Sequence, residues 1–303
     1  MKMKRFPTNR LASVLAATAV LILAADAWPD SAPRAKTAPA IPQGQASGVV
    51  LEYKMPAGQV LKYQDKSEMR QVSDFMGQSV ETAITSTGAY SFQAKGRKDA
   101  NFLLGVTIDD MGMSVATPRG DMSPDLKPVI GKSLDMVLSP LGAEVEVTGA
   151  EAITYELAGS PRNAAAFLKV FFPDLPGNAV KIGDSWPSSY VIEEKSGLTS
   201  MRIEFQSLNT LEGWETVDGM ECARITAKVT GTISGTGKQQ GMDTSTDGTF
   251  KGKDVWYFAV KEGIFVKSTS ELTTETTTSL TGAQSMTIPT TQTRTNEVKL
   301  VGR

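Results

Sequence analysis

Alternation of apolar and polar residues near the end of the chain predicts two long β-strands. From Ile264 to Leu280 the even positions hold Ile, Val and two Leu among Ser and Thr, whereas the lysine and glutamates stand at odd positions. From Met286 to Leu300 the apolar residues again stand at even positions. A period of two places successive side chains on opposite faces of a sheet, and threonine is a good strand former. We expect ordered strands; disorder is the alternative, because Pro289 and many exposed threonines are compatible with it.

The turn between these strands decides their register. If Gly282 to Gln284 form a three-residue loop, Leu280 lies opposite Met286 and Val266 lies opposite Leu300. Both apolar sets then share one face, whereas a two-residue loop would mix the faces. The pattern therefore predicts a hairpin with the three-residue loop.

Similar strand and turn patterns run through the rest of the chain. The stretch DVWYFAVKEGIFVKSTSEL (254–272) indicates a strand, a turn at Gly263 and a second strand, because glycine tolerates positive φ. The stretches 50–64 and 135–149 place Pro and Gly between apolar and polar runs, and we expect both to be hairpins.

One segment, SPRNAAAFLKVFF (160–172), has the pattern of a helix. Ser160 is suited to the cap, and Pro161 is suited to the first helical position. Its apolar residues fall on both sides, so we expect it to be covered on both sides, as a plug or lid. Together these patterns predict a mainly β fold: a curved antiparallel sheet, a half-barrel or open barrel, with one or two short helices packed in or across its concave face.

The N-terminus has the pattern of a secretory signal peptide. Basic residues precede the apolar run from Leu11 to Ala24, and a small-residue cleavage pattern ends at Ala27. The following residues 28–48 are rich in Pro and Ala, which predicts a flexible spacer. We expect residues 1–27 to be the signal peptide and 49–303 to form a single antiparallel β domain. The mature chain is then exported, periplasmic or extracellular, with no transmembrane span.

Composition narrows the chemistry. The chain has no histidine, which removes the commonest general base and zinc ligand, and its one cysteine, Cys222, excludes an intramolecular disulfide. The formal net charge is −2 with scattered basic residues, so we expect no nucleic-acid partner. The spacing of Asp243 to Asp254 matches an EF-hand calcium loop, but its flanks have strand patterns, and we expect no metal and no cofactor. We also expect no catalytic residues and no enzymatic activity; carboxylates meeting in a groove, as in a carbohydrate-active enzyme, are the alternative.

Three stretches resemble a known group of proteins. DVWYFAVKEGIFVKSTSEL (254–272), KIGDSW (181–186) and LSPLGAEVEVTG (138–149) resemble a widespread family of uncharacterised exported bacterial β-rich proteins. More distantly, the chain resembles the periplasmic lipoprotein-carrier and lipid-transporter half-barrels. That resemblance implies a curved sheet whose mouth holds acyl chains.

Two kinds of function remain. The first is a carrier that binds an apolar ligand, such as a lipid or an acylated protein, in the cell envelope. The second is a scaffold for an envelope protein partner, in which the polar hairpin 264–300 presents a strand edge. For the carrier we expect six aromatic residues to contact the ligand: Phe167, Phe171, Phe205, Phe250, Trp256 and Phe258.

Overall fold

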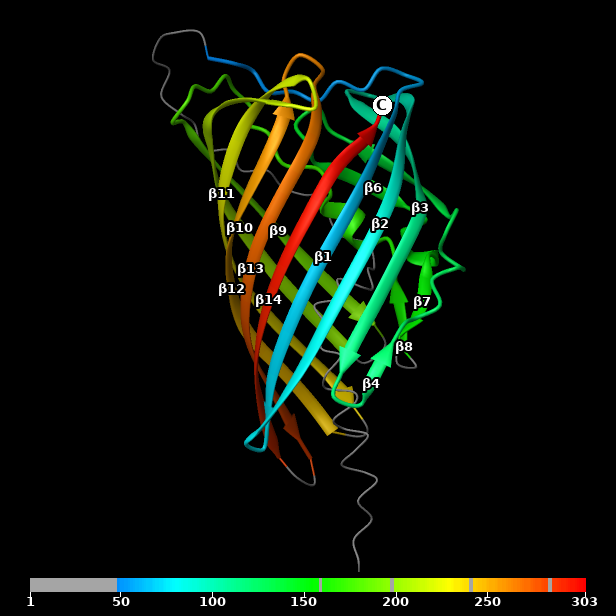
Figure 1. Cartoon of the computed structure of the whole chain (residues 1–303), viewed down its shortest axis with the longest axis vertical. Coiled ribbons are helices and arrows are strands. Elements are labelled where there is room, and N and C mark those ends of the chain that lie inside the picture. The colour runs from blue at the N-terminus through cyan, green and yellow to red at the C-terminus, as the bar shows by residue number, and fades with distance from the viewer. Residues whose placement is uncertain (1–47, 158–159, 197–198, 240–241, 283–284) are drawn as a thin grey trace, which may run out of the picture.

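Most of the chain lies in one curved antiparallel β-sheet. The computed structural model describes residues 48–157, 160–196, 199–239, 242–282 and 285–303. The strand order is β6-β5-β3-β2-β1-β14-β13-β12-β11-β10-β9, with β4 beside β3, and β7 and β8 form a separate ribbon (Figure 1). The end strands β6 and β9 do not pair with each other, so the described sheet is an open half-barrel, as the sequence predicts.

The strands are long and the helical segments short. The elements in chain order are β1 Val60–Phe75, β2 Gln78–Lys98, β3 Asn101–Thr117, β4 Gly120–Met122, β5 Ser133–Leu138, β6 Glu144–Thr148, η1 Ala150–Ala152, β7 Thr154–Leu157, β8 Ser160–Asn163, η2 Ala166–Val170, β9 Ser185–Ser196, β10 Thr199–Val217, β11 Met220–Gln239, β12 Met242–Ala259, β13 Ile264–Thr281 and β14 Met286–Gly302. Both helical segments, η1 and η2, are 3-10 turns. The predicted signal peptide and all but the last residue of the predicted spacer lie outside the described residues.

The predicted C-terminal hairpin is confirmed. Strands β13 and β14 pair from Lys267 opposite Lys299 to Leu280 opposite Met286, which is the register expected from a three-residue loop. The strand, turn and strand around Gly263 are also confirmed, with Gly263 at φ 69° between β12 and β13. The period of two was therefore a sufficient guide to these local pairings.

The hairpin does not present a free edge. Strand β13 pairs with β12 on its other side, and β14 pairs with β1, from Lys62 opposite Gly302 to Ser73 opposite Thr290. The expectation that residues 264–300 offer a strand edge to a partner is wrong. Instead, β14 of the hairpin pairs with β1, so the first and last strands of the domain lie side by side in the middle of the sheet.

Two local predictions are wrong. Residues 50–64 do not form a hairpin, because residues 48–59 cross the end of the half-barrel before β1 begins. The helix predicted to begin at Ser160 is absent, because Ser160 to Asn163 pair with β7 and only the 3-10 turn η2 follows. The hairpin predicted within 135–149 is confirmed by the pairing of β5 with β6.

The crossing segment closes one end of the half-barrel, which we call the covered end. Val49 bridges Val180, the Tyr53 N–H donates to the Pro140 carbonyl at 2.9 Å, and the Lys54 N–H donates to the Gly263 carbonyl at 2.8 Å. Residues 164–176, which include η2, pack their buried side chains in the same core as this segment. The plug that the sequence predicts is therefore present, as a 3-10 turn and irregular chain.

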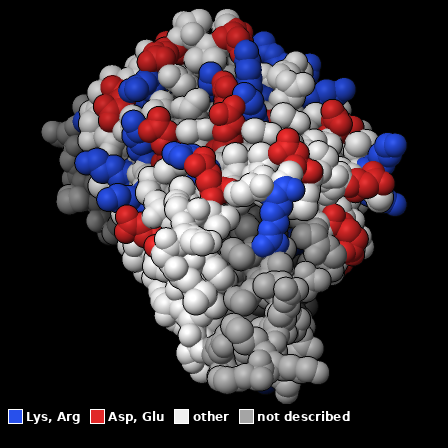
Figure 2. Space-filling view, turned by 60° about the horizontal axis from the view of Figure 1, so that its bottom comes forward, with Lys and Arg blue, Asp and Glu red and all other residues white. Residues whose placement is uncertain are grey.

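The outer face of the sheet carries cross-strand ion pairs. Arg70 contacts Glu81 at 2.5 Å, Lys98 contacts Glu146 at 2.6 Å, and Lys267 contacts Glu297 at 2.7 Å. These exposed pairs contribute little to stability, because water and salt screen them. On the face shown in Figure 2, basic and acidic side chains are mixed and neither sign forms a large patch.

Candidate functional site

Phe167 and Phe171 lie in an aromatic cluster on the concave face at the covered end. The Phe171 ring lies 4.8 Å from that of Phe92, and the Phe167 ring lies 4.9 Å from that of Tyr90. Tyr63 joins the cluster, and its hydroxyl donates to the Phe265 carbonyl at 2.6 Å. Burial raises the pKa of the Tyr63 phenol well above its usual range, which keeps it a neutral donor.

Trp256 and Phe258 belong to the same core. The Trp256 ring lies 6.1 Å from that of Trp186, and the Phe258 ring lies 5.2 Å from that of Tyr53. Both side chains are buried. Four of the six expected ligand contacts thus pack against the protein's own side chains at the covered end.

Phe205 and Phe250 lie in a second cluster, which we call the side cluster. Phe205 of β10 stacks on Tyr190 of β9 at 4.5 Å and lies 4.6 Å from Phe250 of β12. Phe250 is buried, whereas Tyr190 and Phe205 are half-buried. The side cluster is separate from the core at the covered end, so the structure does not bring all six predicted residues together.

A row of polar side chains, which the sequence analysis did not identify, crosses the concave face. Strand pairing aligns Asp254 of β12, Ser270 of β13, Asn296 of β14, Ser67 of β1 and Ser86 of β2. Their positions alternate in phase with the buried residues of the same strands, which places them on the concave face. Every member of this five-strand row is polar.

The end of the half-barrel opposite the covered end is called the tip. A second polar row lies closer to the tip. It aligns Thr274, Gln292, Gln71 and Thr82, next to Phe250 of the side cluster. The Gln292 amide donates to the Gln71 amide oxygen at 3.4 Å. The sequence signal was the Ser, Thr, Asn and Gln at even positions of 264–300, in phase with the apolar residues.

These rows and their polar neighbours on the same face form what we call the polar belt. Its members are Asp65, Ser67, Gln71, Ser73, Thr82, Ser86, Asp254, Ser270, Thr274, Thr276, Thr290, Gln292, Arg294 and Asn296. Leu272 and Met69 interrupt the belt on either side of Arg294. Beyond the belt, Phe75, Leu280 and Ile288 form a small apolar cluster at the tip.

The belt carries few charges. The Arg294 guanidinium donates to the Ser67 hydroxyl at 2.9 Å. Burial raises the pKa of Asp65, while the Tyr90 hydroxyl and Arg294 act in the opposite direction. Residue 88 must be glycine, because a Cβ on Gly88 would overlap the Tyr90 hydroxyl and the Asp65 carboxylate.

Asp254 is the second acid of the belt. Burial raises the pKa of its carboxyl group from 3.8 to about 6. The folded state therefore holds the proton more tightly than the unfolded state. Stability contributed by this group is present below about pH 4 and is lost as the pH rises toward 6.

Asp254→Asn is expected to raise the free energy of unfolding at pH 7.5 by roughly 2 kcal/mol, because it removes a buried charge. The gain should disappear at pH 4, where the parent carboxyl group is protonated. Urea unfolding at both pH values measures this difference. Asp247→Asn, at an exposed position on the other face of β12, is the control for replacing a carboxylate with an amide. Equal effects of Asp254→Asn at both pH values would contradict the assignment.

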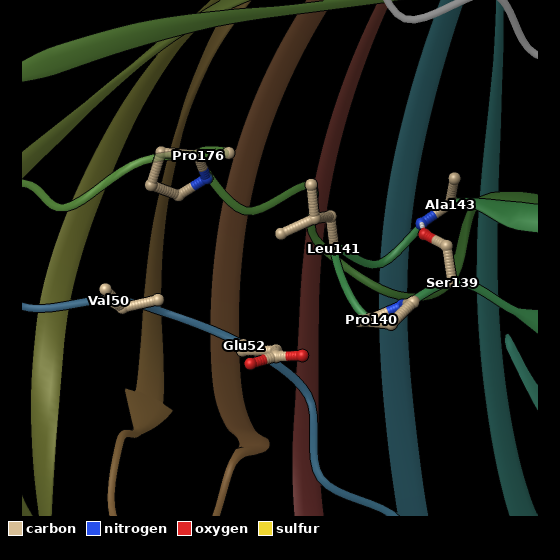
Figure 3. Close-up of a pocket in the computed structure, with 8 residues that line it drawn as sticks. Val50, Glu52, Ser139, Pro140, Leu141, Ala143 and Pro176 are labelled. Atoms are coloured by element: carbon tan, nitrogen blue, oxygen red, sulfur yellow. Dashed lines mark hydrogen bonds between the residues drawn. The ribbon is translucent and has the colours of Figure 1, made fainter. Parts of the chain in front are cut away.

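A surface depression of about 560 Å³ lies at the covered end. Figure 3 shows Val50 and Glu52 of the crossing segment below Leu141 and Pro176. Ser139, Pro140, Ala143 and Gly177 complete its lining. None of the six predicted aromatic residues lines it.

Two further features concern metals and membranes. No group of three or more acidic or cysteine side chains in the described part of the chain is arranged to hold a metal ion. Asp243 to Asp254 lie within β12 and not in a loop. No helix among the described residues is long and apolar enough to cross a membrane.

Comparisons with known proteins give no family assignment. No family model matches the chain, and no curated protein matches it. Among solved structures, an outer membrane channel of Pseudomonas putida F1 has 7% identity and a TM-score of 0.25, covering 82% of this chain and 97% of that chain. Pseudomonas aeruginosa OccK2 has 5% identity and a TM-score of 0.24, covering 83% and 100%. A Bacteroides fragilis protein with a YmcC-like fold has 9% identity and a TM-score of 0.23, covering 83% and 97%. TM-scores this low carry no argument about this protein.

Proposed function

We propose that this protein is exported to the cell envelope and binds an elongated amphipathic molecule, such as a lipid, on its concave face without catalysing a reaction. The N-terminal sequence pattern supports export. The observation that carries the binding proposal is the side cluster. There the half-buried ring of Phe205 packs on Tyr190 and on Phe250, and Phe250 lies opposite Thr274 of the polar belt. A binding site of this kind combines apolar surface with a small number of placed polar groups.

The ligand's place is the half of the concave face toward the tip. At the covered end, Leu168 and Phe172 are buried, and Phe167 of η2 packs against Tyr90 of the aromatic cluster. Displacing that segment would expose a large apolar surface to water, which costs a free energy of roughly 25 cal/mol per Å² of that surface. The side cluster lies outside this core, and its half-buried residues Tyr190 and Phe205 offer apolar surface. The apolar cluster at the tip is also separate from this core, but its three side chains are buried.

A substitution on one strand tests the proposal. Phe205→Ser is expected to weaken binding of the apolar fluorophore 1-N-phenylnaphthylamine by about tenfold, because it removes one aromatic ring from the contact surface. A fluorescence titration of the mature protein measures the dissociation constant. Leu208→Ser is the matched control, because Leu208 lies on the outer face of the same strand and is 48% exposed.

If the two variants bind the fluorophore with equal affinity, the concave face is not the binding site. Mass analysis of the organic extract of protein purified from its native envelope gives an independent result. We expect a stoichiometric amphipathic molecule. An empty, stable protein that does not bind the fluorophore would favour the alternative function, a scaffold for an envelope protein.

A further inference from the structure

The first polar row is unusual for the inner face of a curved sheet. Asp254, Ser270, Asn296, Ser67 and Ser86 belong to five adjacent strands and follow one another across the concave face. Inner faces that serve only as core are apolar, because a buried polar group costs free energy unless it is hydrogen-bonded. The row therefore indicates a polar counterpart for this face.

The hydrogen bonds within the belt leave capacity for that counterpart. Each hydroxyl has one donor and two acceptor positions. Ser73 and Thr290 share one bond at 2.9 Å, and Arg294 donates to Ser67 at 2.9 Å. Within the part of the chain that the structure describes, the half-buried side chains of Ser86, Ser270 and Asn296 make no hydrogen bond, and their donors and acceptors suit a partner that itself both donates and accepts.

The charges of the belt disfavour a charged partner. An anionic group would face the carboxylates of Asp65 and Asp254, and the guanidinium of Arg294 already holds Ser67. A cationic group would face Arg294. Like charges brought together in a partly buried site cost affinity. An uncharged, hydroxyl-rich group avoids both penalties.

We infer that the half-buried side chains of the first row, Ser86, Asp254, Ser270 and Asn296, bind an uncharged, hydroxyl-rich group, a sugar or similar polyol, and that the ligand's apolar part lies on the side cluster. The face of a sugar ring that carries C–H groups also packs on aromatic rings such as those of Tyr190 and Phe205, which stack on each other at 4.5 Å. Phe250 lies between Phe205 and the belt. This inference rests on the proposed binding function and names the chemistry of the ligand's polar part.

Three dodecyl compounds with different headgroups test it on the mature protein. Dodecyl maltoside, dodecylphosphocholine and dodecyltrimethylammonium, all below their micelle concentrations, compete with bound 1-N-phenylnaphthylamine. We expect dodecyl maltoside to bind at least about tenfold more tightly than the other two, because only its headgroup satisfies the belt without a charge. Maltose and maltohexaose, measured by calorimetry, distinguish a free glycan from a glycolipid. Binding of the free sugars with similar affinity would support the polyol site with a soluble source, and binding of the maltoside alone would support it with a lipid source.

Two belt variants test whether the polar belt is the part of the protein that binds the maltoside headgroup. Asn296→Ala and Ser270→Ala are each expected to weaken maltoside binding about fivefold to tenfold, because each removes one hydrogen-bonding group. Their affinity for 1-N-phenylnaphthylamine is measured in parallel, so that a loss confined to the maltoside is distinguished from a general loss of binding. Thr295→Ala and Thr269→Ala are the matched controls, since both residues are exposed on the outer face of the same strands.

Two results would overturn the inference. The first is equal affinity for the three headgroups, and the second is unchanged maltoside binding by both belt variants. If the parent protein does not bind 1-N-phenylnaphthylamine, that result would instead contradict the proposed function, in which the side cluster binds the apolar part of a ligand. The free sugars would then decide by themselves whether the belt binds a polyol.

Discussion

Phe172→Ala is expected to lower the free energy of unfolding by about 4 kcal/mol, within the usual range for removing a buried phenylalanine side chain. Phe172 is 2% exposed and links the segment that contains η2 to the sheet. Its ring lies 5.1 Å from that of Phe92 on β2 and 5.5 Å from that of Tyr53 on the crossing segment. Alanine would leave a cavity where three separate parts of the chain meet.

Urea unfolding followed by tryptophan fluorescence measures this loss. Trp214→Ala is the control for the removal of an aromatic side chain, because Trp214 is 41% exposed on β10. We expect its effect to stay within about 1 kcal/mol. A Phe172→Ala protein as stable as Trp214→Ala would show that the Phe172 side chain is not part of the core.

Gly231→Ala is the second substitution with a large expected effect, a loss of about 3 kcal/mol from overpacking. Gly231 lies on the concave face of β11, opposite Phe250 of β12. A Cβ at this position would overlap both the Glu204 backbone carbonyl oxygen and the Phe250 ring. Either the β10–β11 pairing or the ring must move, and both are parts of the side cluster.

Thermal unfolding and the fluorophore titration together measure this effect, since a displaced Phe250 should also weaken binding. Gly213→Ala on β10 is the matched control. No atom lies within 4 Å of a Cβ built there, and we expect a change within about 0.5 kcal/mol. Equal stability of the two variants would mean that the ring of Phe250 does not occupy the space above Gly231.

The helix prediction shows where local sequence patterns were insufficient. Ser160 and Pro161 have the residue types of a helix start, yet their backbone pairs with Leu157 and Glu156 in the β7–β8 ribbon. Only residues 164–172 separate this ribbon from Pro173, and the residue before a proline disfavours the helical region of φ and ψ. Packing against the aromatic cluster therefore determined the shape of this segment.

The six predicted ligand contacts show a related limit. The alternation correctly placed Phe250, Trp256 and Phe258 on one face of β12. It could not show that residues 164–176 fill the covered end, because that packing depends on contacts between distant parts of the chain, such as Phe92 with Phe172. The separation of the side cluster from the core followed from the same packing.

The sequence by itself determined the β class, the register of the C-terminal hairpin and the turn at Gly263, because side-chain period and turn residues act over a few neighbouring positions. Only the tertiary structure decided that β14 pairs with β1, that residues 48–59 cross the covered end, and that Asp254, Ser270, Asn296, Ser67 and Ser86 align in one row. Each of these depends on the register between strands distant in the chain. That register is set by the packing of the whole sheet and leaves no local pattern in the sequence.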